Sequence, residues 1–418
     1  MISKINLHLM LIIKLKEQFI LLKKMRYVFN ELFCIILFLI LCSTNIIAQN
    51  EGINKTKEIA PGIYHEQIIN KKDRLVINIL KIDLKNKSYI IDAVKADNLL
   101  HSKATTSMVS ARLDIEGFDV IAAINADFWE PDGEIVNNMI SKGAFVKAIS
   151  GYTDIRSNHI FSQFALTKNN KPLIEKFSLN GKLILRNKNV YKINRINSKT
   201  DSSSITLYNH YEGNETPQKH IGWNMSETYL QPSGSLGDTL LFVIKGKWNN
   251  NGETKIPPSG YVLSASNNIG TILEQKIPEN DNVKILLNMN PNLGKIYALT
   301  GGLPLIVENG KNLPELSDTL FGLKKSFTVT QHPRTGLGFS KDSTYLYFFT
   351  VDGRQESSSG MSLKEFAELM ISHGVYQGLN LDGGGSTTMV IHGKVVNHPS
   401  DRTGERPVGS CIVILKKN

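Results

Sequence analysis

The sequence predicts an α+β protein in which a mixed β-sheet core is flanked by a few helices and carries a β-rich inserted subdomain. Most of the chain after residue 48 consists of short apolar or alternating runs separated by polar turns, which is the pattern of strands. Two stretches combine helical spacing with capping residues. Between about residues 171 and 292 the composition shifts toward Asn, Ser, Lys and Gly, with repeated turn signals.

The amino terminus has the pattern of a signal peptide. An apolar run of 11 residues, 32–42, follows Lys23, Lys24 and Arg26 and leads to small and polar residues ending at Ala48. This run is much shorter than the roughly 20 residues of a membrane-spanning helix. We therefore expect a signal peptide over residues 1–48, with Met25 as an alternative start.

The expected destination is the periplasm or the extracellular space, with no stable membrane span after cleavage. A lipid anchor at Cys42 is the less favoured alternative, because the bulky Leu41 precedes the cysteine. Residues 49–418 are expected to form one domain, with the β-rich insertion at about 171–292.

The cysteine count and the charge argue against a disulfide-stabilised protein and against a nucleic-acid-binding protein. Cleavage of the leader would leave only Cys411, so the mature chain has no internal disulfide. Cys411 lies in an apolar run and is expected to be buried as a small hydrophobic residue. The net charge of +10 comes from scattered lysines rather than from a basic stripe, so no nucleic-acid partner is expected.

The first half of the expected core contains strands at 74–83 and 89–94. A helix over 105–115 follows, with a Thr or Ser cap at its start and Gly117 at its end. The continuous apolar run 120–124 then predicts a strand covered on both faces. That strand stops abruptly at 125–129, a segment containing Asn125 and Asp127.

The last hundred residues predict a strand, a helix and a second strand. The strand 346–351 ends at Asp352; Ser362 and Glu365 then have the spacing of a capping box before a helix that Gly374 ends. A further strand, 375–381, leads into Asp382. In a crossover unit both strands present their carboxyl ends at one edge of the sheet, so we expect Asp352 and Asp382 to lie at the same edge.

The stretch 380–388, Asn-Leu-Asp-Gly-Gly-Gly-Ser-Thr-Thr, is the most informative segment of the chain. Consecutive glycines are poor strand residues, and they suit a place where backbone N–H groups approach an anion closely. The spacing fits neither a phosphate-binding P-loop nor a dinucleotide fingerprint. A tight turn with a solvated aspartate is the alternative.

Five stretches together resemble the phosphodiester glycosidase family. They are 123–128, where the family has an Asn-Gly-Gly-Phe-Phe-like turn, and 301–310, 332–338, 352–354 and 380–386. Downstream, 398–401 and 406–407 also fit. The chain departs from the family pattern at Ala126 and Asp127, which replace two glycines. The resemblance implies an exported bacterial hydrolase that cleaves a sugar-1-phosphodiester, N-acetylglucosamine-like or of another sugar, in an envelope polymer or a scavenged glycan.

The resemblance also implies roles for residues. Arg334 is the candidate for the phosphate, and Asp382 is the carboxylate that activates water or stabilises an oxocarbenium ion, with Asp127 as its candidate partner. A separation of about 5 Å between the two carboxyl groups would indicate retention, and about 6.5–9.5 Å inversion. Further substrate contacts are expected from Asn125, His332, Thr335, Asp352, Gly383, Gly384, Gly385, Ser386 and Thr387.

Several alternatives remain open at the level of the sequence. Asp352 could brace a turn, Asn125 could cap one, and His332 could be a packed side chain. No cofactor is expected and no metal ligand is assigned, although Asp127, Asp352 and Asp382 would suit a hard cation. The alternative function is that of a noncatalytic carbohydrate-binding or exopolysaccharide-assembly protein.

Overall fold

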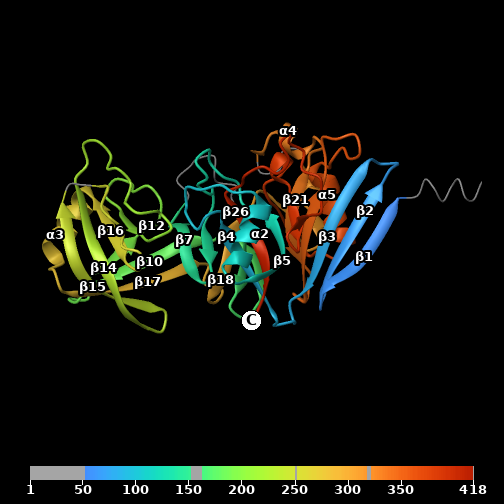
Figure 1. The fold of residues 1–418 in the computed structure, drawn as a ribbon. Helices are drawn as coiled ribbons and strands as arrows, with labels where there is room; N and C mark the ends of the chain where they lie inside the picture. The colour runs from blue at the N-terminus through green and yellow to red at the C-terminus, as the bar shows by residue number, and fades with distance from the viewer. Residues whose placement is uncertain (1–51, 152–161, 250–251, 318–321, 418) are drawn as a thin grey trace, which may run out of the picture. The chain divides into compact units, whose positions relative to one another are not determined.

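The computed structural model describes residues 52–151, 162–249, 252–317 and 322–417 (Figure 1). The expected signal peptide, residues 1–48, lies outside these ranges and stays a prediction. The chain divides into a unit of residues 1–53 with 70–73 and a unit of residues 54–69 with 74–418. Three sheets and a few short helices confirm the predicted α+β class. No helix in the described ranges is long and apolar enough to cross a membrane.

The first sheet has eight strands and carries the carboxyl-terminal motifs. Its spatial order is β1 (Ile53–Ala60), β2 (Ile63–Asn70), β3 (Leu75–Asp83), β22 (Tyr345–Val351), β21 (Arg334–Phe339), β23 (Gln377–Asn380), β19 (Leu305–Glu308) and β20 (Lys311–Asn312).

The central strands of this sheet bring three predicted site residues to one edge. β21 pairs antiparallel with both β22 and β23, so β22 and β23 run in the same direction. Asp352 follows the end of β22, and Asp382 lies two residues beyond the end of β23. Arg334 begins β21 at that edge. The expected placement of Asp352 and Asp382 is therefore confirmed.

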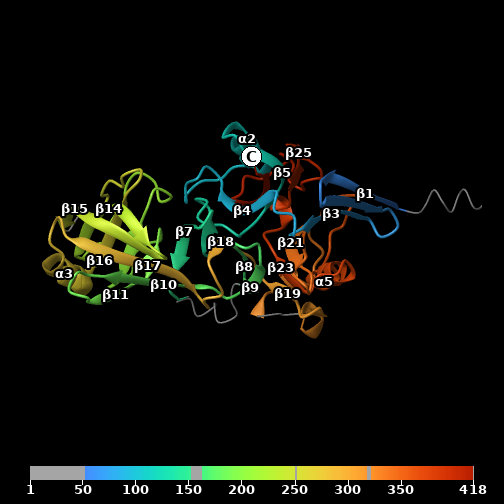
Figure 2. The same cartoon turned by 90° about the horizontal axis from the view of Figure 1, so that it is seen from below.

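Helix α5 (Leu363–Ser372) connects β22 to β23 and begins with the predicted capping box. The Ser362 hydroxyl accepts the Glu365 N–H, and the Glu365 carboxylate accepts the Ser362 N–H at 2.7 Å. Gly336 of β21 lets the helix approach the sheet, because a Cβ atom there would lie 2.4 Å from Met370 Cε. Figure 2 shows α5 beside β19 and β23.

The second sheet has five strands and supports helix α2 (Thr106–Ile115). Its order is β25 (Lys394–Val395), β24 (Met389–Ile391), β5 (Asp119–Asn125), β26 (Ser410–Lys416) and β4 (Tyr89–Lys95). Thr105 caps α2 by accepting the Met108 N–H at 3.2 Å. The predicted helix at 105–115 and strand at 120–124 are thus each confirmed to within a residue or two.

These two sheets and two helices form four layers. In β22, Phe348 points into a core shared with the five-stranded sheet, and the next residue, Phe349, points to α5. In β26, Ile412 faces the same shared core and Val413 faces α2, which lies against β5 and β26 (Figure 1). Cys411 lies on the α2 side and is fully buried, as predicted.

The third sheet has thirteen strands and includes the segment expected to be an insertion. Its order is β11 (Val190–Ile193), β10 (Ser178–Ile184), β17 (Asn282–Asn290), β15 (Thr239–Asn249), β14 (Met225–Leu236), β16 (Tyr261–Ser266), β13 (Ile205–Tyr208), β12 (Arg195–Ile196), β7 (Ala144–Ile149), β6 (Met139–Ser141), β18 (Ile296–Gly301), β8 (Gln163–Thr167) and β9 (Pro172–Glu175).

Part of this sheet has a hydrophobic core of its own. Leu207, Phe242 and Ile285 belong to that core, and helix α3 (Asn267–Lys276) packs on β14 and β16. The parallel pairing of β12 with β13 makes the sheet mixed. The domain boundaries expected at about 171 and 292 stay predictions. Other helical segments in the described ranges are η2 (Pro314–Leu316), α4 (Lys325–Thr328) and η4 (Gly384–Ser386).

Candidate active site

The glycine turn between β23 and β24 is fixed by hydrogen bonds to both neighbouring sheets. The Gly384 N–H donates to the Pro333 carbonyl at 2.9 Å, and the Asp382 N–H donates to the Ala126 carbonyl at 3.0 Å. Asn125 Nδ2 donates to the Asp382 carbonyl at 2.6 Å. The turn therefore holds Asp382 between the end of β5 and the start of β21.

Asn125 and Thr335 brace this turn from beneath. Asn125 Oδ1 accepts the Thr335 hydroxyl at 2.8 Å and the Thr388 N–H at 3.1 Å. Both side chains are fully buried. Asn125 thus connects three segments of backbone, which corresponds to the capping alternative rather than to contact with a sugar hydroxyl.

Asp382 has the carboxylate best placed to meet a substrate. Its side chain is half-buried, and withdrawal from water raises its pKa to about 6. The neighbouring Ser386 hydroxyl, the Arg406 guanidinium and the Trp129 indole act in the opposite direction on this pKa. A carboxyl group with such a pKa is ionised at neutral pH and sits beside a cation and an aromatic ring.

Two of the three glycines make room for arginine side chains. Gly384 has a φ of +61°, and a Cβ atom there would lie 3.1 Å from both terminal nitrogens of Arg354. A Cβ atom on Gly385 would lie 2.2 Å from Arg406 Nη2 and from Asp401 Oδ1. Arg406 and Asp401 form a two-pronged ion pair of 2.8 and 2.9 Å. Two guanidinium groups therefore lie against the turn, and that of Arg406 is paired with a carboxylate.

The predicted cradle of three glycine N–H groups is only partly available to a ligand. The Gly384 N–H is bonded to Pro333, and the Gly383 N–H interacts with the Asp382 carboxylate. The hydroxyls of Thr387 and Thr388, by contrast, are buried and have no hydrogen-bond partner among the described residues, whereas the Ser386 hydroxyl interacts with the Asp382 carboxylate. Hydroxyls left unpaired in this way are suited to bind a polar ligand.

Arg334 lies at the predicted edge, but its guanidinium is occupied by the protein itself. Nε donates to the Met361 carbonyl at 2.8 Å, and Nη2 donates to the carbonyls of Phe327 at 2.8 Å and Thr330 at 3.2 Å. Only 2% of the residue is exposed. Burial lowers its pKa to about 10. Its main contacts hold the segment around α4 against β21, which makes Arg354 and Arg406 the more accessible cations.

His332 orients Arg354. Its Nε2 lies 2.8 Å from the Ser326 carbonyl, so this nitrogen carries the proton, and Nδ1 accepts from Arg354 Nη2 at 3.2 Å. Burial and the two nearby arginines lower the pKa of His332, which keeps the ring neutral. His332 therefore acts as a hydrogen-bond acceptor that fixes a guanidinium beside Gly384.

Asp127 braces the loop that follows β5. Its Oδ1 accepts the Phe128 N–H at 2.9 Å and the Asn137 side chain at 2.7 Å, and its Oδ2 accepts the Asn137 N–H at 2.9 Å. The residue is 1% exposed, and burial raises its pKa to about 6. An aspartate bound on both oxygens is poorly placed to act as the second carboxylate.

Asp352 also braces a turn, which is the alternative role that the sequence suggested for it. Its carboxylate accepts the His398 N–H at 3.0 Å and Asn397 Nδ2 at 3.1 Å. It is 2% exposed, and burial raises its pKa to about 6. Asp352 thus holds the segment 397–398 in place near the glycine turn.

Trp129, Arg354 and Arg406 were not among the predicted site residues. Arg354 and Arg406 both lie in or beside stretches that carry the family resemblance, and Trp129 follows the 123–128 stretch directly. Their position within matched motifs was a usable signal. Only the fold, however, brings the three of them around Asp382 and its glycines.

Comparison with known proteins supports the same region. A family model described as phosphodiester glycosidase matches residues 239–415. The N-acetylglucosamine-1-phosphodiester alpha-N-acetylglucosaminidase of Homo sapiens is 29% identical over 161 residues, which cover 36% of this chain and 29% of that enzyme. The Bos taurus enzyme of the same name is 40% identical over 133 residues, covering 32% of this chain and 24% of that enzyme. The chain thus spans less than a third of these curated relatives.

A solved structure shows that the fold is shared more widely. The crystal structure of a hypothetical protein from Synechocystis matches with a TM-score of 0.66 at 17% identity, over 87% of this chain and 64% of that chain.

The match to the family model contains Arg354, Asp382 and Arg406, whereas Asn125, Asp127 and Trp129 lie before it.

Proposed function

We propose that this chain, which belongs to the phosphodiester glycosidase family, is an exported hydrolase that cleaves sugar-1-phosphodiester bonds. The family supports hydrolysis of sugar phosphodiesters. The names of the human and bovine relatives suggest an N-acetylglucosamine-like sugar as the first substrate to test. The observation that carries the proposal is a half-buried aspartate, Asp382, flanked by the guanidinium groups of Arg354 and Arg406 on one turn.

The two arginines suit the phosphate of such a substrate. A phosphodiester carries one negative charge, and guanidinium groups donate charge-assisted hydrogen bonds to its oxygens. Arg354 is held by His332, and Arg406 is held by Asp401, so both donors are positioned before a ligand binds. Arg334 supports this arrangement from beneath the turn.

The sugar is proposed to lie against Trp129 and the hydroxyl of Thr387. An indole ring is a suitable apolar surface for a sugar ring, and the unpaired Thr387 hydroxyl can bond a sugar hydroxyl. This arrangement brings the anomeric carbon to Asp382 and the phosphate to the arginines. Asn125, Thr335, Asp352 and Asp127 then act by fixing the backbone around the site.

The reaction breaks the bond between the anomeric carbon and the phosphate oxygen. Water adds its oxygen to the anomeric carbon and releases a proton, and the bonding electrons leave with the phosphate monoester. Phosphate is a good leaving group, so the site needs to stabilise an oxocarbenium-like transition state rather than supply a strong acid. The ionised carboxylate of Asp382 provides a negative charge at that position.

The first prediction tests Asp382. Asp382→Asn should reduce release of N-acetylglucosamine from an aryl N-acetylglucosamine-1-phosphodiester by about 10²–10⁴-fold, because the amide carries no negative charge. The matched control is Asp342→Asn, an exposed aspartate in the loop between β21 and β22, at the opposite end of these strands. It should retain wild-type turnover.

Two results would count against the proposal. Wild-type turnover by Asp382→Asn would remove the assigned role of this residue. A wild-type protein that binds glycans but hydrolyses no member of a panel of aryl and nucleotide sugar phosphodiesters would instead support the noncatalytic carbohydrate-binding alternative.

A further inference from the structure

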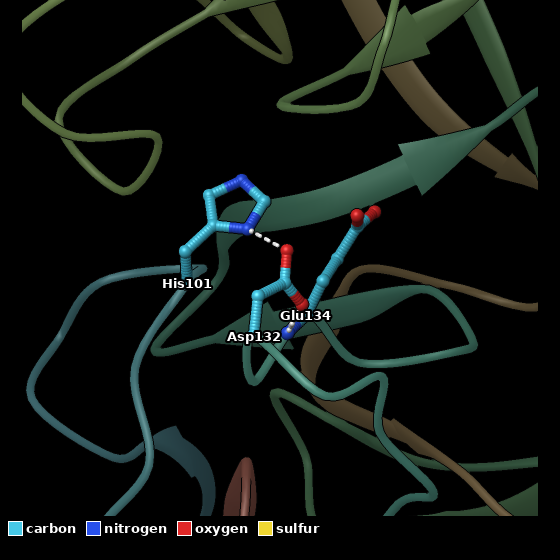
Figure 3. Close-up of side chains that lie close together, drawn as sticks. All are labelled: His101, Asp132 and Glu134. Carbon is cyan, nitrogen blue, oxygen red and sulfur yellow. Dashed lines mark hydrogen bonds and ion pairs between the residues drawn. The ribbon is translucent and has the colours of Figure 1, made fainter.

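A second cluster of charged side chains lies in a cleft of about 680 Å³ whose lining does not include the glycine turn. His101, Asp132 and Glu134 contribute ligand atoms that all lie within 4.8 Å of one another. Figure 3 shows the Asp132 carboxylate directed toward a ring nitrogen of His101, with Glu134 on the same side. These three residue types are the common ligands of divalent metal ions in proteins.

The backbone fixes two of these side chains. Asp132 and Glu134 stand at the tip of a hairpin over 128–136, and Asp132 Oδ1 accepts the Glu134 N–H at 3.0 Å. Asp132 Oδ2 is 2.9 Å from His101 Nδ1. Glu134 Oε1 pairs with Lys147 at 2.6 Å, which leaves its other carboxylate oxygen for a ligand.

Glu212 supplies an independent observation. Its side chain is only 4% exposed, it lines the same cleft, and its Oε1 lies 3.5 Å from His101 Nε2. Its Oε2 is buried and has no hydrogen-bond partner among the described residues. A buried carboxylate with an unpaired oxygen is costly unless a positive charge lies close by. The cluster therefore combines an unpaired buried charge with three ligand-type side chains.

We propose that this cleft is a binding site for a divalent metal ion of the Zn²⁺ or Mn²⁺ type. His101 Nδ1, Asp132 Oδ2 and Glu134 are the ligands, and the ion replaces the proton between His101 and Asp132. Glu212 accepts the Nε2–H of His101, which is the usual way in which a carboxylate orients a metal-bound histidine. One imidazole among the ligands favours a transition-metal ion over Ca²⁺ or Mg²⁺.

Because of the position of the cleft, a bound ion also affects the hairpin that carries Trp129. The hairpin that carries Asp132 and Glu134 at its tip carries Trp129 at its base, where Trp129 pairs with Ile135. Lys103 lies over the Trp129 ring, 4.9 Å from its centre. An ion bound at the tip fixes the loop that places Trp129 beside Asp382. The metal site itself does not depend on the proposed hydrolase activity.

The test is calorimetric titration of chelator-treated full-length protein with ZnCl₂, repeated with MnCl₂, CaCl₂ and MgCl₂. We expect saturable binding of about one Zn²⁺ or Mn²⁺ ion. His101→Gln and Asp132→Asn should each weaken binding by more than about tenfold, and Glu212→Gln by about 10–100-fold, as for other residues that orient metal ligands. Glu215→Gln, an acid lining the same cleft outside the cluster, is the matched control and should bind like wild type.

A second readout separates metal binding from folding defects. Zn²⁺ should raise the melting temperature of the wild type and of Glu215→Gln but not that of Asp132→Asn, measured on samples with matching circular dichroism spectra. The proposal is overturned if no saturable Zn²⁺ or Mn²⁺ binding occurs, if Ca²⁺ or Mg²⁺ binds more tightly than both, or if His101→Gln and Asp132→Asn keep wild-type affinity. Equal losses in Glu215→Gln and Asp132→Asn would show diffuse attraction and would also overturn it.

Discussion

Asp127, Asp352 and Asp382 have similar pKa values but different contacts. Asp127 accepts hydrogen bonds on both oxygens from its own loop, and Asp352 accepts them on both oxygens from residues 397–398, whereas Asp382 is half-buried beside Arg406 and Trp129. Burial alone raises a carboxyl pKa, so a raised value does not identify a reacting group. What distinguishes Asp382 is that its neighbours are suited to bind an anion and a sugar.

The environment of Asp382 predicts the pH dependence of hydrolysis. If the ionised carboxylate is required, kcat/KM should fall about tenfold per pH unit below a pKa of about 6. Arg406 lowers this pKa, so Arg406→Gln should move the acid limb of the profile to higher pH. A phosphodiester keeps a single charge through this range, and the limb therefore reports on the enzyme. An acid limb that stays at the same pH in Arg406→Gln would show that another group controls it.

Substitution of Arg354 is expected to weaken substrate binding, whereas substitution of Arg334 is expected to lower stability. Arg354→Ala should raise KM for the phosphodiester by about 10–100-fold, the worth of a hydrogen bond to a charged group, with little change in the affinity for free sugar. Arg334→Ala should instead lower the free energy of unfolding by about 2–4 kcal/mol, because three carbonyls each lose a donor, although the Met361 carbonyl keeps the His332 N–H. Urea unfolding and steady-state kinetics measure the two effects. If Arg334→Ala kept wild-type stability but had a raised KM, Arg334 would be the residue that contacts the phosphate.

At the scale of the element, the closeness of helix α5 to its sheet depends on a strand glycine. Gly336→Ala places a methyl group against Met370 and Phe366, at 2.4 and 2.8 Å in the present packing. The resulting overpacking should lower the free energy of unfolding by about 1–3 kcal/mol. Urea denaturation measures the change.

Two further variants test the reason for this loss. Gly151→Ala meets no atom within 4 Å and should be neutral. Shortening the opposing side chain by Met370→Ala should make the cost of Gly336→Ala smaller than it is in the wild type. Equal costs in both backgrounds would show that contact with Met370 is not the cause.

The elements that could be predicted are those with a strong local signal. The capping box at Ser362 and Glu365, the buried strand before Asn125 and the turn at Asp382 all follow from short patterns. The function of the glycine triplet could not be predicted fully, because the guanidinium groups that it accommodates come from Arg354 and Arg406, distant in sequence. The hydrogen bonds that occupy Arg334 likewise depend on the packing of α4.

At the scale of the whole molecule, the alternation of apolar and polar residues along strands was enough to predict a layered α+β core. It could not predict which neighbouring layer each face of a strand packs against. Phe348 and Phe349 are equally apolar, and only the packing of a second sheet and of α5 shows which layer each residue joins. The thirteen-stranded order of the third sheet depends on pairings such as that of β12 with β7, between strands far apart in sequence. Such long-range pairings leave no periodic signal in one sequence.

The layered core buries three aspartates, and together they predict how stability depends on pH. Burial raises the pKa values of Asp92, Asp127 and Asp352 to about 6 each, from an ordinary value of 3.8. Between pH 4 and pH 6 the folded state therefore binds more protons than the unfolded state. This contribution to stability is fully present below the unfolded pKa and is lost as the pH rises through about 6.

The melting temperature should accordingly fall between pH 4.5 and pH 7, with a loss on the order of a few kcal/mol of unfolding free energy. Asp92→Asn isolates one contribution, because Asp92 accepts hydrogen bonds from Ser141 and Lys142 that an amide can largely retain. Its melting temperature should change little at pH 4.5 and rise at pH 7, which flattens the pH dependence. Differential scanning calorimetry measures both. A wild-type melting temperature that increases steadily from pH 4.5 to pH 7 would mean that these carboxyl groups are ionised in the fold at no cost, and that their hydrogen bonds outweigh burial.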